Sequence, residues 1–137
     1  MPSVHQHTIR DGLIYLHHPD HRNWTHGKSK WSISEWDERD VFTVSSNRNW
    51  GIEKKRWGIY FQENRPAYLG LAQDHITQVF LAKFVTGNGT EWHGYPADHQ
   101  KNNQDRPPVE LQQTWMDDDV LPKAKIRKIA KGQPCNL

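Results

Sequence analysis

Three side chains capable of acid–base and metal chemistry lie close together in the stretch EWHGYPADHQKNNQDRPP, residues 91–108: His93, Asp98 and His99. Imidazole nitrogens and carboxylate oxygens bind Zn²⁺ and other divalent transition metals. A metal held in this way can activate a bound water for hydrolysis. Further candidate ligands lie in a second histidine-rich loop, at His17, His18, Asp20, His21 and His26. The pattern therefore allows a small nuclease-like hydrolase whose catalytic and metal-binding residues are His93, Asp98 and His99, with a divalent metal as its candidate cofactor.

The spacing of these residues leaves a structural interpretation open. His93 and His99 are separated by a glycine and a proline, so they are not held on one helical face. Neither an HExxH motif nor a CxxC pair is present. The alternative is a set of exposed loop histidines, with one or two of them hydrogen-bonded in the core. His93 is the strongest individual candidate for acid–base work, because Asp98 or Glu91 could orient one of its ring nitrogens.

A second candidate surface interleaves cations with aromatic rings in NRNWGIEKKRWGIYF, residues 47–61. Cations that contact phosphates beside rings that stack on bases are the usual means of binding single strands. The candidate nucleic-acid-binding residues here are Arg48, Trp50, Lys54, Lys55, Arg56 and Trp57. The alternative is a hairpin whose tryptophans face inward and whose basic turn is solvated.

The C-terminal segment carries the most coherent charge pattern. Residues 120–131 contain no acidic residue and five cations: Lys123, Lys125, Arg127, Lys128 and Lys131. On a helix, Ile126 and Ile129 share one face and most of the cations gather on the opposite face. Dipole matching and solubility would also explain such a helix. We predict that it binds DNA or RNA.

The segment LQQTWMDDDVLPKAKIRKIAKG resembles a helix-turn-helix in one respect. Leu121, Ile126 and Ile129 stand where the second helix of that motif buries its residues. The segment departs from the motif in two others, because an Asp-Val pair stands where the turn often has a glycine, and Met116 stands where a small residue is usual. The alternative is a plain helical hairpin packed on a sheet.

The elements that must position these side chains are predicted to be strands in the N-terminal part of the chain and helices in the C-terminal part. Asp11-Gly12 is a favoured hairpin turn between two apolar stretches, residues 4–9 and 13–16. Alternating, β-branched or aromatic residues predict further strands over residues 31–36, 41–45, 56–61 and 65–72.

Residues 74–87 carry conflicting signals. Apolar residues at helical spacing lie between Asp74, a candidate N-cap, and Gly87, a candidate C-terminal cap. The β-branched residues and the turn at Asn88-Gly89 favour a strand instead. We predict the helix, because both of its ends carry signals. After the double proline, two short helices are predicted, with Pro122 in the first turn of the second and Gly132 after its last.

Together these elements predict an α+β fold, in which a β-rich N-terminal region forms an antiparallel sheet and C-terminal helices pack on it. We expect one domain over residues 1–137, with a β-rich region over residues 1–72, a helix and loop over 73–108 and a helical hairpin over 109–132. Hydrophobic residues make up only 34%, but seven Trp, four Tyr and four Phe predict an aromatic core.

The cysteine content and the hydropathy of the chain indicate the cellular compartment in which we expect the protein. Cys135 is the only cysteine, which rules out an internal disulfide and fits a reducing compartment. The first twelve residues lack the apolar run of a signal peptide, and no segment approaches the length of a membrane span. We therefore expect a cytoplasmic protein without membrane association.

Two main classes of function and a third possibility remain. The one we favour is a small nucleic-acid-binding module that uses the basic C-terminal helix, because that helix is more coherent than the scattered histidines. The alternatives are the hydrolase centred on His93, Asp98 and His99, and a protein-interaction domain that uses exposed tryptophans as anchors. Whether the protein is an enzyme stays open at this stage.

Overall fold

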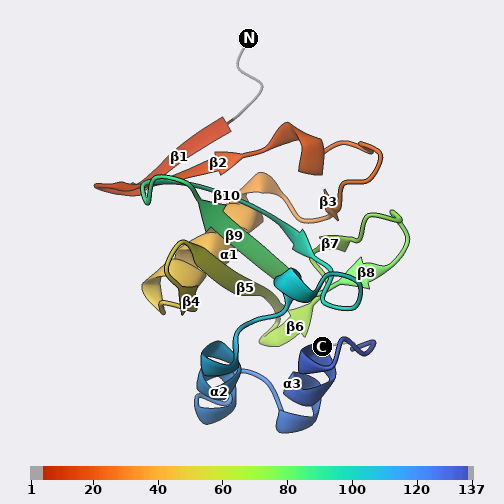
Figure 1. The fold of residues 1–137 in the computed structure, drawn as a ribbon. Coiled ribbons are helices and arrows are strands. Elements are labelled where there is room, and N and C mark those ends of the chain that lie inside the picture. Colours follow the sequence, from red (N-terminus) through yellow and green to blue (C-terminus); the bar gives the residue numbers. More distant parts are fainter. Residues whose placement is uncertain (1–4, 136–137) are drawn as a thin grey trace.

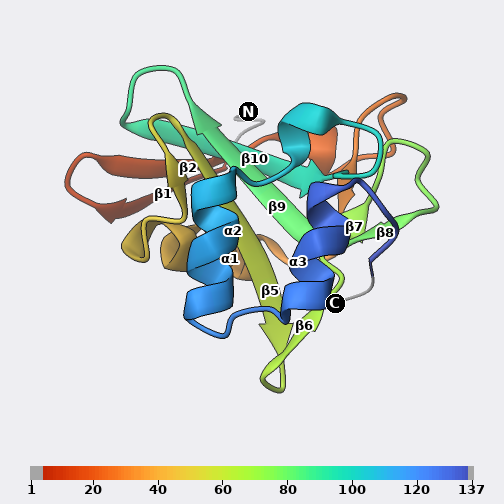
Figure 2. The same cartoon turned by 60° about the horizontal axis from the view of Figure 1, so that its bottom comes forward.

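The computed structural model describes residues 5–135 and has helices on both faces of a central sheet (Figure 1). Seven strands form this sheet, in the order β1-β2-β10-β9-β5-β4 with β6 paired to β5. The helix α1 packs on one face, and α2 and α3 cover part of the other, as the turned view in Figure 2 shows. The α+β class is confirmed. The sheet is mixed, however, because β2 and β10 run parallel while the other pairs are antiparallel.

The N-terminal hairpin forms as predicted. β1 (His5–Arg10) pairs with β2 (Leu13–His17), and Gly12 in the turn has a φ of 77°, which glycine adopts at little cost. The start of the predicted first strand, Val4, lies outside the described residues. A short 3-10 helix, η1 (Pro19–His21), follows β2 in the histidine-rich loop.

Two of the predicted strands, at residues 31–36 and 41–45, were wrong. Only β3 (Lys30–Trp31) is extended, and α1 (Glu35–Asn47) occupies the rest. Ser34 caps α1 by accepting a hydrogen bond from the amide of Asp37 at 3.1 Å. The buried residues of α1 are Glu38, Val41, Phe42 and Ser45. Their spacing of three and four residues is helical, and it overrides the β propensity of the VFTV segment.

The middle of the chain builds the centre of the sheet and a small second sheet. β5 (Lys55–Gln62) forms where a strand was predicted over residues 56–61, and with β4 (Gly51–Ile52) it makes the hairpin of the alternative interpretation. β6 (Arg65–Ala67) pairs with the far end of β5. A separate three-stranded sheet contains β3, β7 (Gly70–Leu71) and β8 (Gln78–Val79).

The predicted helix over residues 74–87 was also wrong. β8 and β9 (Leu81–Thr86) occupy this segment, and β9 pairs with β5 on one side and with β10 (Glu91–Ala97) on the other. Asp74 accepts hydrogen bonds from the amides of Ile76 and Thr77, so it closes a local turn and caps no helix. Ile76, one of the apolar residues at helical spacing, is 80% exposed. The residues of the central strand β9 are buried on both faces of the sheet, which explains why they form a near-continuous apolar run.

The two C-terminal helices form as predicted. They are α2 (Val109–Asp117) and α3 (Lys123–Ala130), and a 3-10 turn, η2 (Asn103–Asp105), precedes them. Gly132 follows the end of α3 with a φ of 68°. The described helices include none that is long and apolar enough to cross a membrane.

Two buried clusters lie on opposite faces of the sheet. Side chains of α2 and α3 pack with Trp57, Ile59 and Leu81 on one face. On the other face, Phe42 of α1 packs with Tyr15 and Phe84. The sheet is thus shared by both clusters.

Candidate functional site

The basic face of α3 is held outward by the apolar residues opposite it. Ile126 and Ile129 are 2% and 1% exposed, in the same cluster as Trp115 of α2. The exposed cations of the helix are Lys123, Arg127, Lys128 and Lys131, while Lys125 is partly buried. Within residues 5–135, none of those four exposed cations makes an ion pair. The helix therefore presents a row of solvated positive charge.

The connection between α2 and α3 is a tight turn that fixes their relative placement. Asp119 adopts a φ of 55°, a left-handed conformation at the position where a helix-turn-helix often has a glycine. Leu121 is buried directly after the turn. The backbone amide of Val120 also donates to the carbonyl of Trp115 at 2.8 Å. Both helices pack against the sheet through Leu111, Trp115, Ile126 and Ile129.

The tryptophans of the 47–61 stretch lie in the core. Trp50 is 2% and Trp57 is 3% exposed, and Trp57 donates from Nε1 to the carbonyl of Asp105 at 3.0 Å. A base cannot stack on either ring in this structure, which corresponds to the inward-facing alternative. The cations Arg48, Lys54 and Lys55 are exposed, whereas Arg56 is partly buried, and that burial lowers its pKa.

The three residues of the histidine–aspartate stretch occupy different environments. His93 lies in the middle of β10 and is partly exposed. Asp98 is 2% exposed and accepts a hydrogen bond from the amide of Gln100. His99 is 7% exposed, and its Nε2 lies 2.8 Å from the carbonyl oxygen of Gln133, which ties the segment after α3 to this loop. Among the residues that the structure describes, no group of three His, Cys, Asp or Glu side chains is placed to hold a metal ion.

A buried polar network that the sequence did not reveal lies next to this stretch. The carboxylate of Asp105, 1% exposed, accepts from the Tyr95 hydroxyl at 2.7 Å and from the amide of Asp98 at 3.1 Å. Lys83 Nζ lies 3.9 Å from the same carboxylate and donates to the carbonyl of Gln104 at 2.6 Å. Burial and the adjacent Asp105 raise the pKa of Tyr95, while burial lowers the pKa of Lys83 against the opposing effect of Asp105. A lysine inside the apolar run LAKFV is the one sequence signal of this network.

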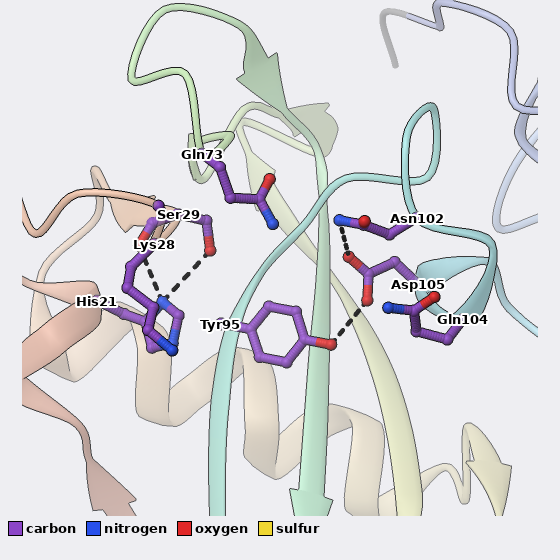
Figure 3. Close-up of a pocket in the computed structure, with 9 residues that line it drawn as sticks. His21, Lys28, Ser29, Gln73, Tyr95, Asn102, Gln104 and Asp105 are labelled. Carbon is purple, nitrogen blue, oxygen red and sulfur yellow. Dashed lines mark hydrogen bonds between the residues drawn. The ribbon is translucent and has the colours of Figure 1, made fainter.

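This network forms one wall of a hollow of about 230 Å³ (Figure 3). The phenol ring of Tyr95 lines the hollow between His21 and Asp105 (Figure 3). The His21 ring is stacked on it, with 5.5 Å between the ring centroids. The remaining polar lining comes from three loops and includes Lys28, Ser29, Gln73, Asn102 and Gln104. A pocket with amide, imidazole, ammonium and carboxylate groups suits a small polar ligand better than an apolar one.

On the α1 side of the sheet, Glu38 forms a second buried polar cluster. Its carboxylate is fully buried and accepts from the Tyr15 hydroxyl and from the Arg22 guanidinium. His17 Nδ1 lies 3.1 Å from the same carboxylate. Burial, with the negative charge of Glu38, raises the pKa of Tyr15. Because Glu38, Tyr15 and His17 are almost inaccessible, this cluster is best explained as a structural link between β2, the histidine-rich loop and α1.

Two other tryptophans are exposed, each beside a cation. Trp24 and Trp36 are each 63% exposed; Lys30 Nζ lies 4.7 Å from the centroid of the first ring, and Arg39 Cζ lies 5.3 Å from that of the second. These two exposed aromatic–cation pairs thus lie outside the 47–61 stretch.

Comparison of the chain with protein family models, with curated proteins and with solved structures gives no match.

Proposed function

We propose that the protein is a small cytoplasmic nucleic-acid-binding module whose main contact surface is the outward face of α3. The observation that carries this proposal is the row of four exposed cations on a helix whose opposite face is buried. Cations fixed on a packed helix can contact successive phosphates and release the counterions condensed around them. The lone Cys135, 8% exposed with its pKa raised by burial, is an unreactive thiol that suits a reducing compartment.

The acidic end of α2 limits where a polyanion can lie. Asp117, Asp118 and Asp119 are all exposed and precede α3 by only a few residues. Their charge would repel phosphates near Lys123, so the contact is centred on Arg127, Lys128 and Lys131. Further exposed cations are Lys54 and Lys55 at the β4–β5 hairpin and Arg48 at the C-terminal end of α1.

The buried positions of Trp50 and Trp57 bear on the kind of recognition. With these rings in the core, the surface offers phosphate contacts and no base stacking from the 47–61 stretch. Phosphate contacts fix position on a strand and carry no sequence information. The binding we propose is therefore tolerant of sequence and strongly dependent on salt.

Fluorescence anisotropy with short labelled RNA and DNA over a range of salt concentrations tests the proposal. For single strands, each phosphate neutralised contributes about −0.7 to the slope of log affinity against log salt. We therefore expect the variant Arg127→Gln/Lys128→Gln to flatten the slope by roughly 1.4, if both cations contact phosphates.

The matched control is Arg10→Gln/Arg39→Gln, which removes the same charge from the α1 side of the sheet. Arg39 lies on α1, and Arg10 bonds to Asn47 at the end of that helix. This control should leave the slope unchanged, and both variants should melt at the wild-type temperature. Equal effects of the two variants would mean that net charge and not α3 drives binding. Dissociation constants above about 100 μM for both nucleic acids at low salt would refute the proposal.

A further inference from the structure

Three histidines from two distant segments of the chain meet on the open region of the sheet face that α2 and α3 share. His93 comes from β10, while His18 and His21 come from the loop after β2. The ring centroid of His18 lies 6.0 Å from that of His93 and 6.0 Å from that of His21. All three side chains are partly exposed, so a ligand can reach them.

The hydrogen bonds of His18 and His21 assign them different tautomers. His21 Nδ1 lies 2.9 Å from the carbonyl oxygen of Ser29, which can only accept, so this nitrogen carries the proton. The Nε2 atom of neutral His21 is therefore a free base. His18 Nδ1 instead accepts from the backbone amide of Asp20 at 3.3 Å, so in neutral His18 the proton is on Nε2. In their neutral forms, His21 thus presents an unprotonated Nε2 atom and His18 presents an Nε2–H group.

Local charge and burial favour the unprotonated form of two of these rings. Burial lowers the pKa of His21, and the nearby His18 and Lys28 lower it further. Burial and His18 also lower the pKa of His93. Asp20 Oδ2 lies 3.9 Å from His18 Nδ1. The two rings with a lowered pKa, His21 and His93, are therefore the candidates for a general base.

The histidines lie between two hollows, so a bound chain can extend to both sides of them. His21 lines the hollow at Tyr95, where the amides of Gln73, Asn102 and Gln104 could bond the edges of a base (Figure 3). His93 lines a second, shallower hollow with Asn88 and Glu91. A ligand that fills both hollows passes over His18.

Cations also lie around the three histidines on this face of the sheet. Lys55 and His93 both lie opposite Val85 of β9, one on each neighbouring strand, so their side chains leave the same face. Lys55 is exposed, and Lys28 lines the hollow at His21. Both can oppose the charge of a phosphate held between the histidines.

We propose that His18, His21 and His93 form a site that cleaves RNA by internal transesterification, an inference that rests on the proposed nucleic-acid binding. His21 Nε2 removes the proton of a ribose 2′-hydroxyl, and the 2′-oxygen forms a bond to the adjacent phosphorus. The bond from phosphorus to the 5′-oxygen breaks. His18 enters the step as the imidazolium, with both ring nitrogens protonated and the Asp20 carboxylate 3.9 Å from Nδ1, and it becomes neutral by giving its Nε2 proton to that oxygen. The products are a 2′,3′-cyclic phosphate and a free 5′-hydroxyl. The step needs no other reactant, and His93 binds the phosphate.

The test uses a short labelled RNA and the DNA of the same sequence, both in EDTA, with cleavage followed by electrophoresis and end-group analysis. We expect the RNA to be cut to 2′,3′-cyclic phosphate ends and the DNA, which lacks the nucleophile, to stay intact. Loss of one general acid or base should slow cleavage by about 10²–10⁴-fold. His18→Ala and His21→Asn are the variants, because an asparagine at 21 can keep the hydrogen bond to Ser29 while removing the base.

The matched control is His26→Ala, which changes an exposed histidine of the same loop and should cleave at the wild-type rate. Anisotropy on the same samples separates the two proposals. RNA that binds but stays intact overturns the cleavage site and leaves the binding module in place. Absence of both binding and cleavage overturns both. Cleavage that persists in folded His18→Ala and His21→Asn overturns the assignment of these residues.

Discussion

Glu38 shows how a single buried carboxylate joins three segments of the chain. It is fully buried and lies against Tyr15 of β2, Arg22 of the following loop and His17. Removing one partner of a buried ion pair leaves the other charge uncompensated, which typically costs about 3–5 kcal/mol. We expect Glu38→Ala to lower the free energy of unfolding by about that amount, measured by urea denaturation.

Asp40→Ala is the matched control for Glu38→Ala, because it removes an exposed carboxylate from the same helix. Its effect should stay within about 0.5 kcal/mol. A comparable loss in both variants would show that helix charge, and not the buried cluster, sets the stability.

Asp74 gives a prediction about acid titration. Its carboxylate accepts from the Thr77 hydroxyl at 2.6 Å and from the amides of Thr77 and Ile76, and these bonds lower its pKa to about 2. An unfolded aspartate titrates near about 3.9, so this stabilisation is present above that pH and is lost as the pH falls through about 2.

Carboxyl-detected NMR titration measures the Asp74 pKa directly. Thr77→Val removes the hydroxyl donor and should raise the pKa, whereas Thr77→Ser keeps the donor and should preserve the low value. An unchanged pKa in Thr77→Val would mean that the backbone amides alone hold the carboxylate in its charged form.

The candidate catalytic residues could be predicted from the sequence only partially. His93, His18 and His21 were all recognised as chemically capable, but the predicted grouping joined His93 with Asp98 and His99. Neighbours in sequence on a loop need not converge, and here His99 bonds to Gln133 while the His93 ring meets His18. The pairing of β2 with β10 brings His18 and His93 together, and this is a contact between strands far apart in the chain.

At the scale of elements, Gly58 of β5 lets Val41 of α1 pack directly against the sheet, because it has no side chain. A Cβ atom at this position would lie 2.6 Å from Val41 Cγ1 of α1 and 3.1 Å from Phe84 Cε2. Overpacking of this kind typically costs about 1–3 kcal/mol, so we expect Gly58→Ala to lower the free energy of unfolding by that amount.

Gly87→Ala is the matched control, because a Cβ there meets nothing within 4 Å and its φ is not in the left-handed region. Thermal and urea unfolding of both variants measure the difference. A neutral Gly58→Ala would show that α1 can shift away from β5 without loss of packing.

Local signals predicted some elements well and others poorly, for a physical reason. The Asp11-Gly12 turn and the caps around α3 act within a few residues, and both elements formed as predicted. Residues 41–45 have β propensity but form helix, because burial against the sheet at helical spacing decides. Residues 74–87 carry apolar residues at helical spacing, but residues 81–86 within this segment form strand β9, because β5 and β10 pair with its two edges.

At the scale of the whole molecule, the two clusters share one sheet, and this bears on cooperativity. Alternate residues of β5 and β9 face opposite clusters, so neither cluster can lose its packing while the sheet stays intact. The C-terminal segment is also tied back, since His99 bonds to Gln133 and Cys135 is buried beside α3. We therefore predict that α2 and α3 unfold together with the sheet, as one domain.

Urea unfolding followed by tryptophan fluorescence and by far-UV circular dichroism tests this single transition. Trp50, Trp57 and Trp115 report on one cluster, and Trp31 and Trp92 on the other. Ile129→Ala should lower the free energy of unfolding by about 2–5 kcal/mol and move both signals to the same new midpoint. Val109→Ala, a truncation of a 72% exposed residue on α2, should move neither. If Ile129→Ala instead separates the two signals into an early helical step and a later sheet step, α2 and α3 form a unit of their own.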